Sequence, residues 1–117
     1  MRGQGAYLAA GLLALLSACA SAPPQPLTMP AADGRAAEVA PGDGFRYVVT
    51  RRAVDHALGG VVLRVTRAGA PELTYSDGLA AKRAAEAYCG QFNRGLDPRA
   101  FGRFSVPASW LFEGGCT

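Results

Sequence analysis

Two stretches decide the fold: FRYVVTR at residues 45–51 and VVLRVTR at residues 61–67. In both, large apolar residues alternate with polar or smaller ones, which is the period of a strand with one buried face. Positions 45, 47 and 49 of the first stretch and 61, 63 and 65 of the second point inward on this pattern. The connection between them ends in Gly59-Gly60, a turn-like pair. We therefore predict two adjacent antiparallel strands.

The rest of the fold is predicted outward from this pair. A short third strand is expected at residues 72–75, a helix at about 79–92, and two further strands at about 101–106 and 109–112, with Pro107 between them. The sequence therefore predicts an α+β domain, a small two-layer sandwich. One helix packs on an antiparallel sheet of three to five strands, in the order β-β-(β)-α-β(-β).

The core must rest on a few large side chains, because much of the apolar fraction is alanine and glycine. The residues expected in it are Phe45, Tyr47, Val49, Val61, Leu63, Val65, Tyr88, Phe92, Phe101, Phe104, Trp110 and Phe112. The last aromatic residues of this set could instead line a ligand groove. A domain this small needs them for burial, so we predict that they belong to the core.

The N-terminus has the layout of an export signal. Arg2 is followed by the apolar run from Ala6 to Leu16 and by small residues, in the order of a secretory leader. The run is too short for a membrane span, since even the 13 residues from Ala6 to Ala18 would cover only about 20 Å of a hydrocarbon core of about 30 Å. Retention as an anchor helix is the weaker alternative. We predict that residues 1–18 are a signal peptide that is removed.

The end of this leader, Leu16-Ser17-Ala18-Cys19, resembles the lipobox of bacterial lipoproteins. The resemblance implies cleavage before Cys19, a covalent lipid on its sulfur, and attachment to the membrane without a spanning helix. Ala20 follows in place of the aspartate that commonly signals retention in the inner membrane. The resemblance thus favours the outer membrane, on its periplasmic face. Ordinary secretion with a chance cysteine is the alternative.

Residues 19–44 have the composition of a linker, with five prolines among Ala, Ser, Gly and Asp. We predict a lipid-anchored tether here, in which Ala36 to Ala40 could form a helical turn. The folded domain is then expected to be residues 45–117. No domain family is recognised in this part of the chain.

Three cysteines are present, and lipid attachment at Cys19 leaves Cys89 and Cys116 as a pair. An exported protein meets oxidising conditions, so we predict a disulfide between them. A redox or metal role is the alternative. Neither cysteine belongs to a CxxC motif, and His56 is the only histidine, so no metal site and no cofactor besides the lipid are expected.

Arg46, Arg52 and Arg64 share the outward parity of the two strands, and they form a candidate surface for an anionic ligand, lipid or envelope polymer. A solvated sheet face is the alternative reading of the same pattern. His56 beside Asp55 could act as a general base, but no nucleophile is linked to it by a motif. A solvated loop position is the simpler interpretation of His56.

The net charge of +3, or +2 without Arg2, is too small to indicate nucleic-acid binding. No catalytic motif occurs, so the chain is not expected to be an enzyme. We predict a membrane-anchored envelope lipoprotein whose small domain contacts an envelope protein or polymer. The alternative is a binder of small anionic ligands that uses the arginine-bearing face.

Overall fold

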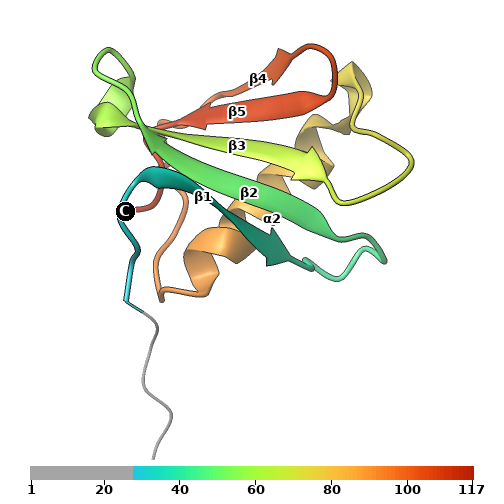
Figure 1. Ribbon diagram of the computed structural model, residues 1–117, viewed down its shortest axis with the longest axis horizontal. Coiled ribbons are helices and arrows are strands. Elements are labelled where there is room, and N and C mark those ends of the chain that lie inside the picture. The colour runs from blue at the N-terminus through green and yellow to red at the C-terminus, as the bar shows by residue number, and fades with distance from the viewer. Residues whose placement is uncertain (1–27) are drawn as a thin grey trace, which may run out of the picture.

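The computed structural model describes residues 28–117. Its sheet has five antiparallel strands in the order β1-β2-β3-β5-β4. Helix α2 covers one face of this sheet (Figure 1). The elements are β1 (Asp33–Val39), β2 (Tyr47–Ala53), the 3-10 turn η1 (Leu58–Gly60), β3 (Val61–Arg67), the 3-10 turn η2 (Tyr75–Asp77), α2 (Gly78–Gly90), β4 (Gly102–Ser105) and β5 (Ser109–Glu113). The predicted α+β two-layer architecture is confirmed.

The core lies between α2 and the inward positions of the central strands. Tyr47 and Val49 of β2 and Leu63 and Val65 of β3 have no exposed surface. The side of α2 that faces them carries small residues and one ring, and the buried members are Ala81, Ala84, Ala85, Tyr88 and Cys89. The alternation read from the sequence therefore assigns the buried face of both strands correctly.

Two residues expected in the core are exposed, and four others, Val61, Phe92, Phe104 and Trp110, are only partly buried. Phe101 is 87% exposed and Phe45 is 40% exposed. Both lie just outside a strand, where the alternation of inward and outward positions no longer applies. Leu73, which the pattern did not single out, is buried in their place.

The sheet has an edge strand that the sequence analysis assigned to the tether. Residues 33–39 form β1, which pairs with β2 from Asp33↔Arg52 to Val39↔Tyr47, so the predicted turn of helix at 36–40 is wrong. The register shifts between Asp33 and Ala36, and this irregularity hides the strand period. The folded unit therefore begins before residue 45. The predicted signal peptide, Cys19 and the first part of the tether lie outside the described residues.

The strand predicted at residues 72–75 is also wrong. Residues 72–74 have no regular structure, and Tyr75 begins η2. A capping box closes this turn, because the Thr74 N–H donates to Asp77 Oδ2 at 2.8 Å and the Thr74 hydroxyl donates to the same atom at 3.0 Å. Local polar pairing therefore replaces a strand ladder at this point.

The first residue of helix α2, Gly78, lies against the indole ring of Trp110. A Cβ atom at Gly78 would lie 2.9 Å from Cη2 of Trp110. The indole cannot move aside freely, because its Nε1 donates a hydrogen bond to the Thr74 carbonyl at 3.0 Å. Glycine at this position therefore permits the close contact between α2 and β5.

We expect Gly78→Ala to lower the free energy of unfolding by about 1 to 2 kcal/mol, because the added methyl group overpacks the Trp110 contact. The matched control is Gly90→Ala at the other end of the helix, where a Cβ atom would meet nothing within 4 Å. That change should be neutral or stabilise by up to about 1 kcal/mol. Urea unfolding followed by tryptophan fluorescence measures both. Equal effects of the two substitutions would contradict the packing argument.

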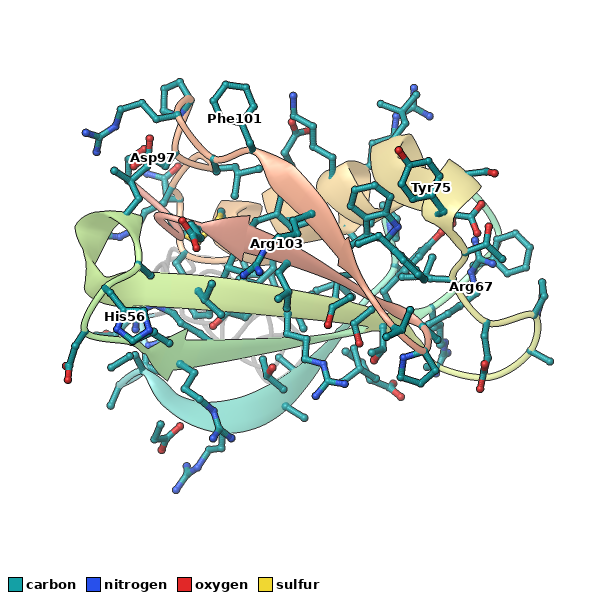
Figure 2. All side chains as sticks on the ribbon, turned by 90° about the horizontal axis from the view of Figure 1, so that it is seen from above. His56, Arg67, Tyr75, Asp97, Phe101 and Arg103 are labelled. Carbon is teal, nitrogen blue, oxygen red and sulfur yellow. A yellow bond between two sulfur atoms is a disulfide. The ribbon has the colours of Figure 1, made fainter. Side chains whose placement is uncertain are left out.

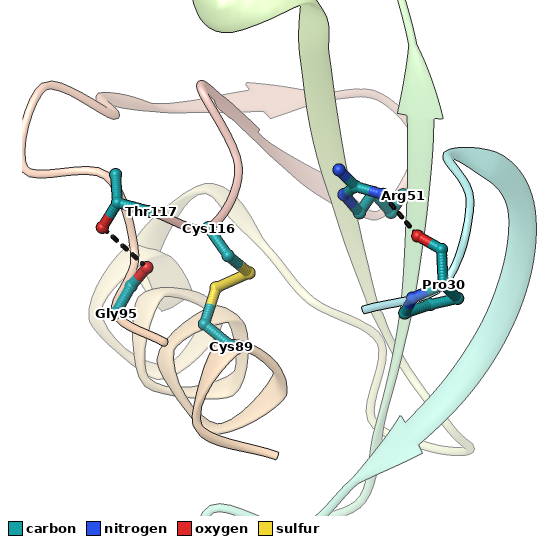
Figure 3. The surroundings of a disulfide bond; sticks show 6 residues. All are labelled: Pro30, Arg51, Cys89, Gly95, Cys116 and Thr117. Atoms are coloured by element: carbon teal, nitrogen blue, oxygen red, sulfur yellow. Dashed lines mark hydrogen bonds between the residues drawn. A yellow bond between two sulfur atoms is a disulfide. The ribbon is translucent and has the colours of Figure 1, made fainter. Parts of the chain in front are cut away.

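A disulfide joins Cys89 of α2 to Cys116 after β5, as predicted. Beside it the last residues pair with the loop after the helix: the Asp97 N–H donates to the Gly115 carbonyl at 2.9 Å and the Thr117 N–H to the Gly95 carbonyl at 2.8 Å. Figure 3 shows this corner, with the hydrogen bond that the Thr117 hydroxyl donates to the Gly95 carbonyl. The C-terminus is therefore fixed to the helix layer by covalent and hydrogen bonds together.

Candidate functional site

The sheet face opposite α2 is uncovered in the part of the chain that the structure describes (Figure 1). The even-numbered residues of β2 and β3 point to this face. With one residue of β5 they enclose a shallow hollow of about 400 Å³. The residues that line it are Val48, Thr50, Arg52, Val62, Arg64, Thr66 and Leu111. We refer to it below as the sheet-face hollow.

Two of the three arginines predicted to bind an anion lie in this hollow. Arg64 is opposite Thr50 in the ladder, and Arg52 is two residues further along β2, so the two occupy diagonal positions on neighbouring strands. The third, Arg46, lies outside the hollow and forms an ion pair with Glu38 at 3.7 Å. The structure therefore reduces the predicted set of three arginines to a pair.

Arg64 is held in place by β5. Its Nε donates a hydrogen bond to the Ser109 hydroxyl at 2.9 Å, and Ser109 is buried. This bond directs the guanidinium toward β5 and leaves the two Nη groups available for a ligand. Arg52 instead reaches toward β1, where a Cβ atom at Gly34 would lie 2.7 Å from its Nη2.

The acidic residues near the hollow are occupied elsewhere. Glu113 pairs with Arg103 at 3.8 Å, and Asp33 pairs with Arg35 at 3.6 Å. Among residues 28–117, no carboxylate forms an ion pair with Arg52 or Arg64. The hollow therefore contains two arginines that form no ion pair within the described part of the protein.

The neighbouring arginines Arg51 and Arg67 belong to the other face. Arg51 Nη1 donates to the Pro30 carbonyl at 2.7 Å, and Arg67 Nη1 donates to the Pro71 carbonyl at 3.0 Å. Both therefore hold loop segments to the sheet and are not directed at the hollow.

A polar cluster at the end of β2 also stabilises a loop. The Tyr47 hydroxyl donates to the carboxylate of Asp43, and this bond is the main cause of the lowered pKa of Asp43. Burial, followed by the same bond, raises the pKa of Tyr47. The guanidinium of Arg67 stacks on the Phe45 ring at 4.3 Å. The cluster closes the β1–β2 connection and contains no free charge.

An aromatic cluster lies at the end of the sheet near the start of α2. The ring of Phe104 packs against two other rings. Its centroid is 6.3 Å from that of Tyr75 and 5.8 Å from that of Trp110. Tyr75 is nevertheless 78% exposed. The prediction that these rings belong to the core therefore holds for Phe112, which is buried, but only in part for Phe104 and Trp110.

His56 does not approach the hollow. It is exposed on the connection between β2 and β3, at the opposite end of the molecule from Tyr75 (Figure 2). Residues 28–117 contain no cluster of three or more His, Cys, Asp or Glu side chains that could hold a metal ion. Within the same residues, no helix is long and apolar enough to span a membrane.

The hollow combines chemical groups suited to binding. Guanidinium groups form paired hydrogen bonds with carboxylate or phosphate oxygens, the hydroxyls of Thr50 and Thr66 add polar contacts, and Val48, Val62 and Leu111 supply apolar surface. Sequence reasoning missed Leu111, Ser109 and Gly34, because their positions beside the arginines depend on the register of β5 and on strand β1. The alternation of residues 109–113 was the available signal for the first two.

Comparison with known proteins finds no family model, no curated protein and no solved structure that matches this chain.

Proposed function

We propose that this chain is a lipid-anchored protein of the bacterial envelope whose domain binds an anionic partner at the sheet-face hollow. The observation that carries the proposal is the pair Arg52 and Arg64, which lie in one hollow and share no carboxylate among the described residues. Binding, with no chemical step, is the proposed role.

Electrostatics supports this reading of the hollow. Arg46, which precedes β2, and Arg103 of β4 are each paired with a glutamate, whereas Arg52 and Arg64 form no ion pair among the described residues. An anionic ligand would supply the missing negative charge, and guanidinium is the side chain best suited to oxyanions. The unmatched pair is therefore better explained by a partner than by sheet stability.

The anchor remains part of the proposal and rests on the resemblance of Leu16-Ser17-Ala18-Cys19 to a lipobox. Acyl chains contribute about 0.8 kcal/mol per buried CH2, so two or three chains would hold the protein durably at a membrane. Attachment through Cys19, in the outer membrane and facing the periplasm, would confine the domain to envelope partners. An acidic envelope polymer, protein or small molecule is the class of partner that this location offers.

The proposal is tested with the chain from Ala20 onward, which keeps every described residue and has no lipid. We expect this protein to bind poly-glutamate. The double variant Arg52→Gln with Arg64→Gln should bind about tenfold more weakly, because it loses two exposed ionic contacts that each contribute about 0.7 kcal/mol. Isothermal titration calorimetry at low and at moderate salt provides the measurement.

The matched control removes the same charge from another part of the surface. Arg83 and Arg94 are exposed, and among the described residues neither forms an ion pair. Arg83→Gln with Arg94→Gln should lower the affinity no more than about twofold, through net charge alone. If the two double variants weaken binding equally, the hollow is not the binding site.

A further inference from the structure

We infer that the natural ligand of the sheet-face hollow is an elongated small molecule with an acidic group at each end, bound across the strands. This inference rests on the proposed function and specifies its ligand. It follows from the directions in which the two arginine side chains extend and from what lies between them.

The two guanidinium groups diverge. Arg52 extends over β1, because its Nη2 lies 2.7 Å from where a Cβ atom of Gly34 would be. Arg64 extends over β5, because its Nε is bonded to Ser109 Oγ at 2.9 Å. Strands β1 and β5 are separated by β2 and β3. At a strand spacing of about 4.8 Å, β1 and β5 lie about 14 Å apart across the sheet, so the two guanidinium groups are too far apart to hold one carboxylate together.

Glycine at position 34 accommodates this arrangement. Gly34 has a φ of +83°, and its missing side chain leaves the space that the Arg52 guanidinium occupies. The register irregularity of β1 falls at the same place, between Asp33 and Ala36. The Arg52 guanidinium therefore lies over the glycine of the edge strand, whereas the Arg64 guanidinium is hydrogen-bonded to Ser109.

The surface between the arginines suits the middle of such a ligand. Thr50 and Thr66 present hydroxyls there, and Val48, Val62 and Leu111 present apolar groups. The volume of about 400 Å³ is within the range of small-molecule sites, about 300 to 1,000 Å³. These features favour a molecule of limited length over a long polyanion.

The protein's own N-terminal segment is excluded as the occupant by its charge. No aspartate or glutamate occurs from Met1 to Ala32. The part of the predicted tether before β1, residues 19–32, therefore has no acidic side chain that could neutralise Arg52 or Arg64. Charge complementarity points to a separate acidic molecule.

The experiment compares diacids with their half-esters, using the chain from Ala20 onward and two-dimensional NMR titration. Suberate should bind about tenfold more tightly than monomethyl suberate, because only the diacid can make both charged contacts. Succinate is too short to reach both arginines. It should bind at most about twofold more tightly than monomethyl succinate, because it has two equivalent carboxylates that can each make the single contact. Shifted amides should lie in β2, β3 and β5.

Single variants separate the two ends of the ligand. Arg52→Gln and Arg64→Gln should each reduce the affinity for suberate to that of its half-ester, whereas Arg83→Gln should leave the difference intact. Equal affinities of suberate and its half-ester for the unmodified protein would overturn the inference. If poly-glutamate binding still depends on the arginine pair in that case, the proposed function survives. Failure of every anion to bind would remove both proposals.

Discussion

Replacing both bridged cysteines with alanine is expected to lower the free energy of unfolding by about 3 to 4 kcal/mol. Cys89 and Cys116 are separated by 27 residues, and the bond closes a loop that contains β4 and β5. Without it, the unfolded chain gains the conformational freedom of that loop. Small domains have a total stability of only about 5 to 15 kcal/mol, so a large part would be lost.

Reductant separates the effect of the bond from the effect of the side chains. Urea unfolding is measured for the unmodified protein and for the Cys89→Ala, Cys116→Ala double variant, each with and without dithiothreitol. The unmodified protein should lose stability on reduction, and the variant should not respond. If thiol titration shows full reduction and the unfolding midpoint of the unmodified protein stays unchanged, the bond does not stabilise the fold.

The parts of the fold that were predicted correctly are those in which a local pattern coincides with burial. In β2 and β3 the inward positions 47, 49, 63 and 65 are fully buried, and Val61, at the start of β3, is partly buried. The helix was predicted at about residues 79–92, close to its observed range, and the disulfide was predicted from the number of cysteines. In each case one local feature of the sequence was sufficient.

The errors fall where a distant contact decides the structure. Strand β1 contains Ala36 and Ala37, has little apolar character of its own, and forms because the edge of β2 supplies its hydrogen bonds. Residues 72–74, in contrast, have the residue types of a strand, but no neighbouring edge pairs with them within the described chain. In both segments, the presence or absence of a partner strand decided the structure, and the strand propensity of the residues did not.

The same reasoning explains how much of the candidate site was foreseen. Arg52 and Arg64 were found because parity along one strand fixes the face on which a side chain lies. Their environment was not foreseen, because Ser109 and Gly34 reach them through the register of strands β5 and β1. Parity also grouped Arg46 with the pair, although Glu38 on β1 neutralises it.

A chain that begins at Gly44, the boundary expected from the sequence, should lose about 4 kcal/mol or more of stability relative to one that begins at Thr28. The shorter chain lacks β1 and with it the buried side chain of Val39. It also lacks Ala32, whose carbonyl accepts a hydrogen bond from the Ala53 N–H at 3.1 Å, and Pro30, which accepts one from Arg51. The long edge of β2 would be exposed, which favours association between chains.

Thermal unfolding followed by circular dichroism, with sedimentation velocity for association, compares the chains that begin at Ala20, Thr28 and Gly44. The first two should unfold at the same temperature, because both keep all of the described residues. The third should be unfolded or associated under the same conditions. Equal stability of the Gly44 chain would mean that β1 is dispensable and that the tether extends to residue 44. If β1 is required, only residues 19–32 remain between the proposed lipid and the sheet. Gly34, over which the Arg52 guanidinium lies, is then the second residue after this shorter tether.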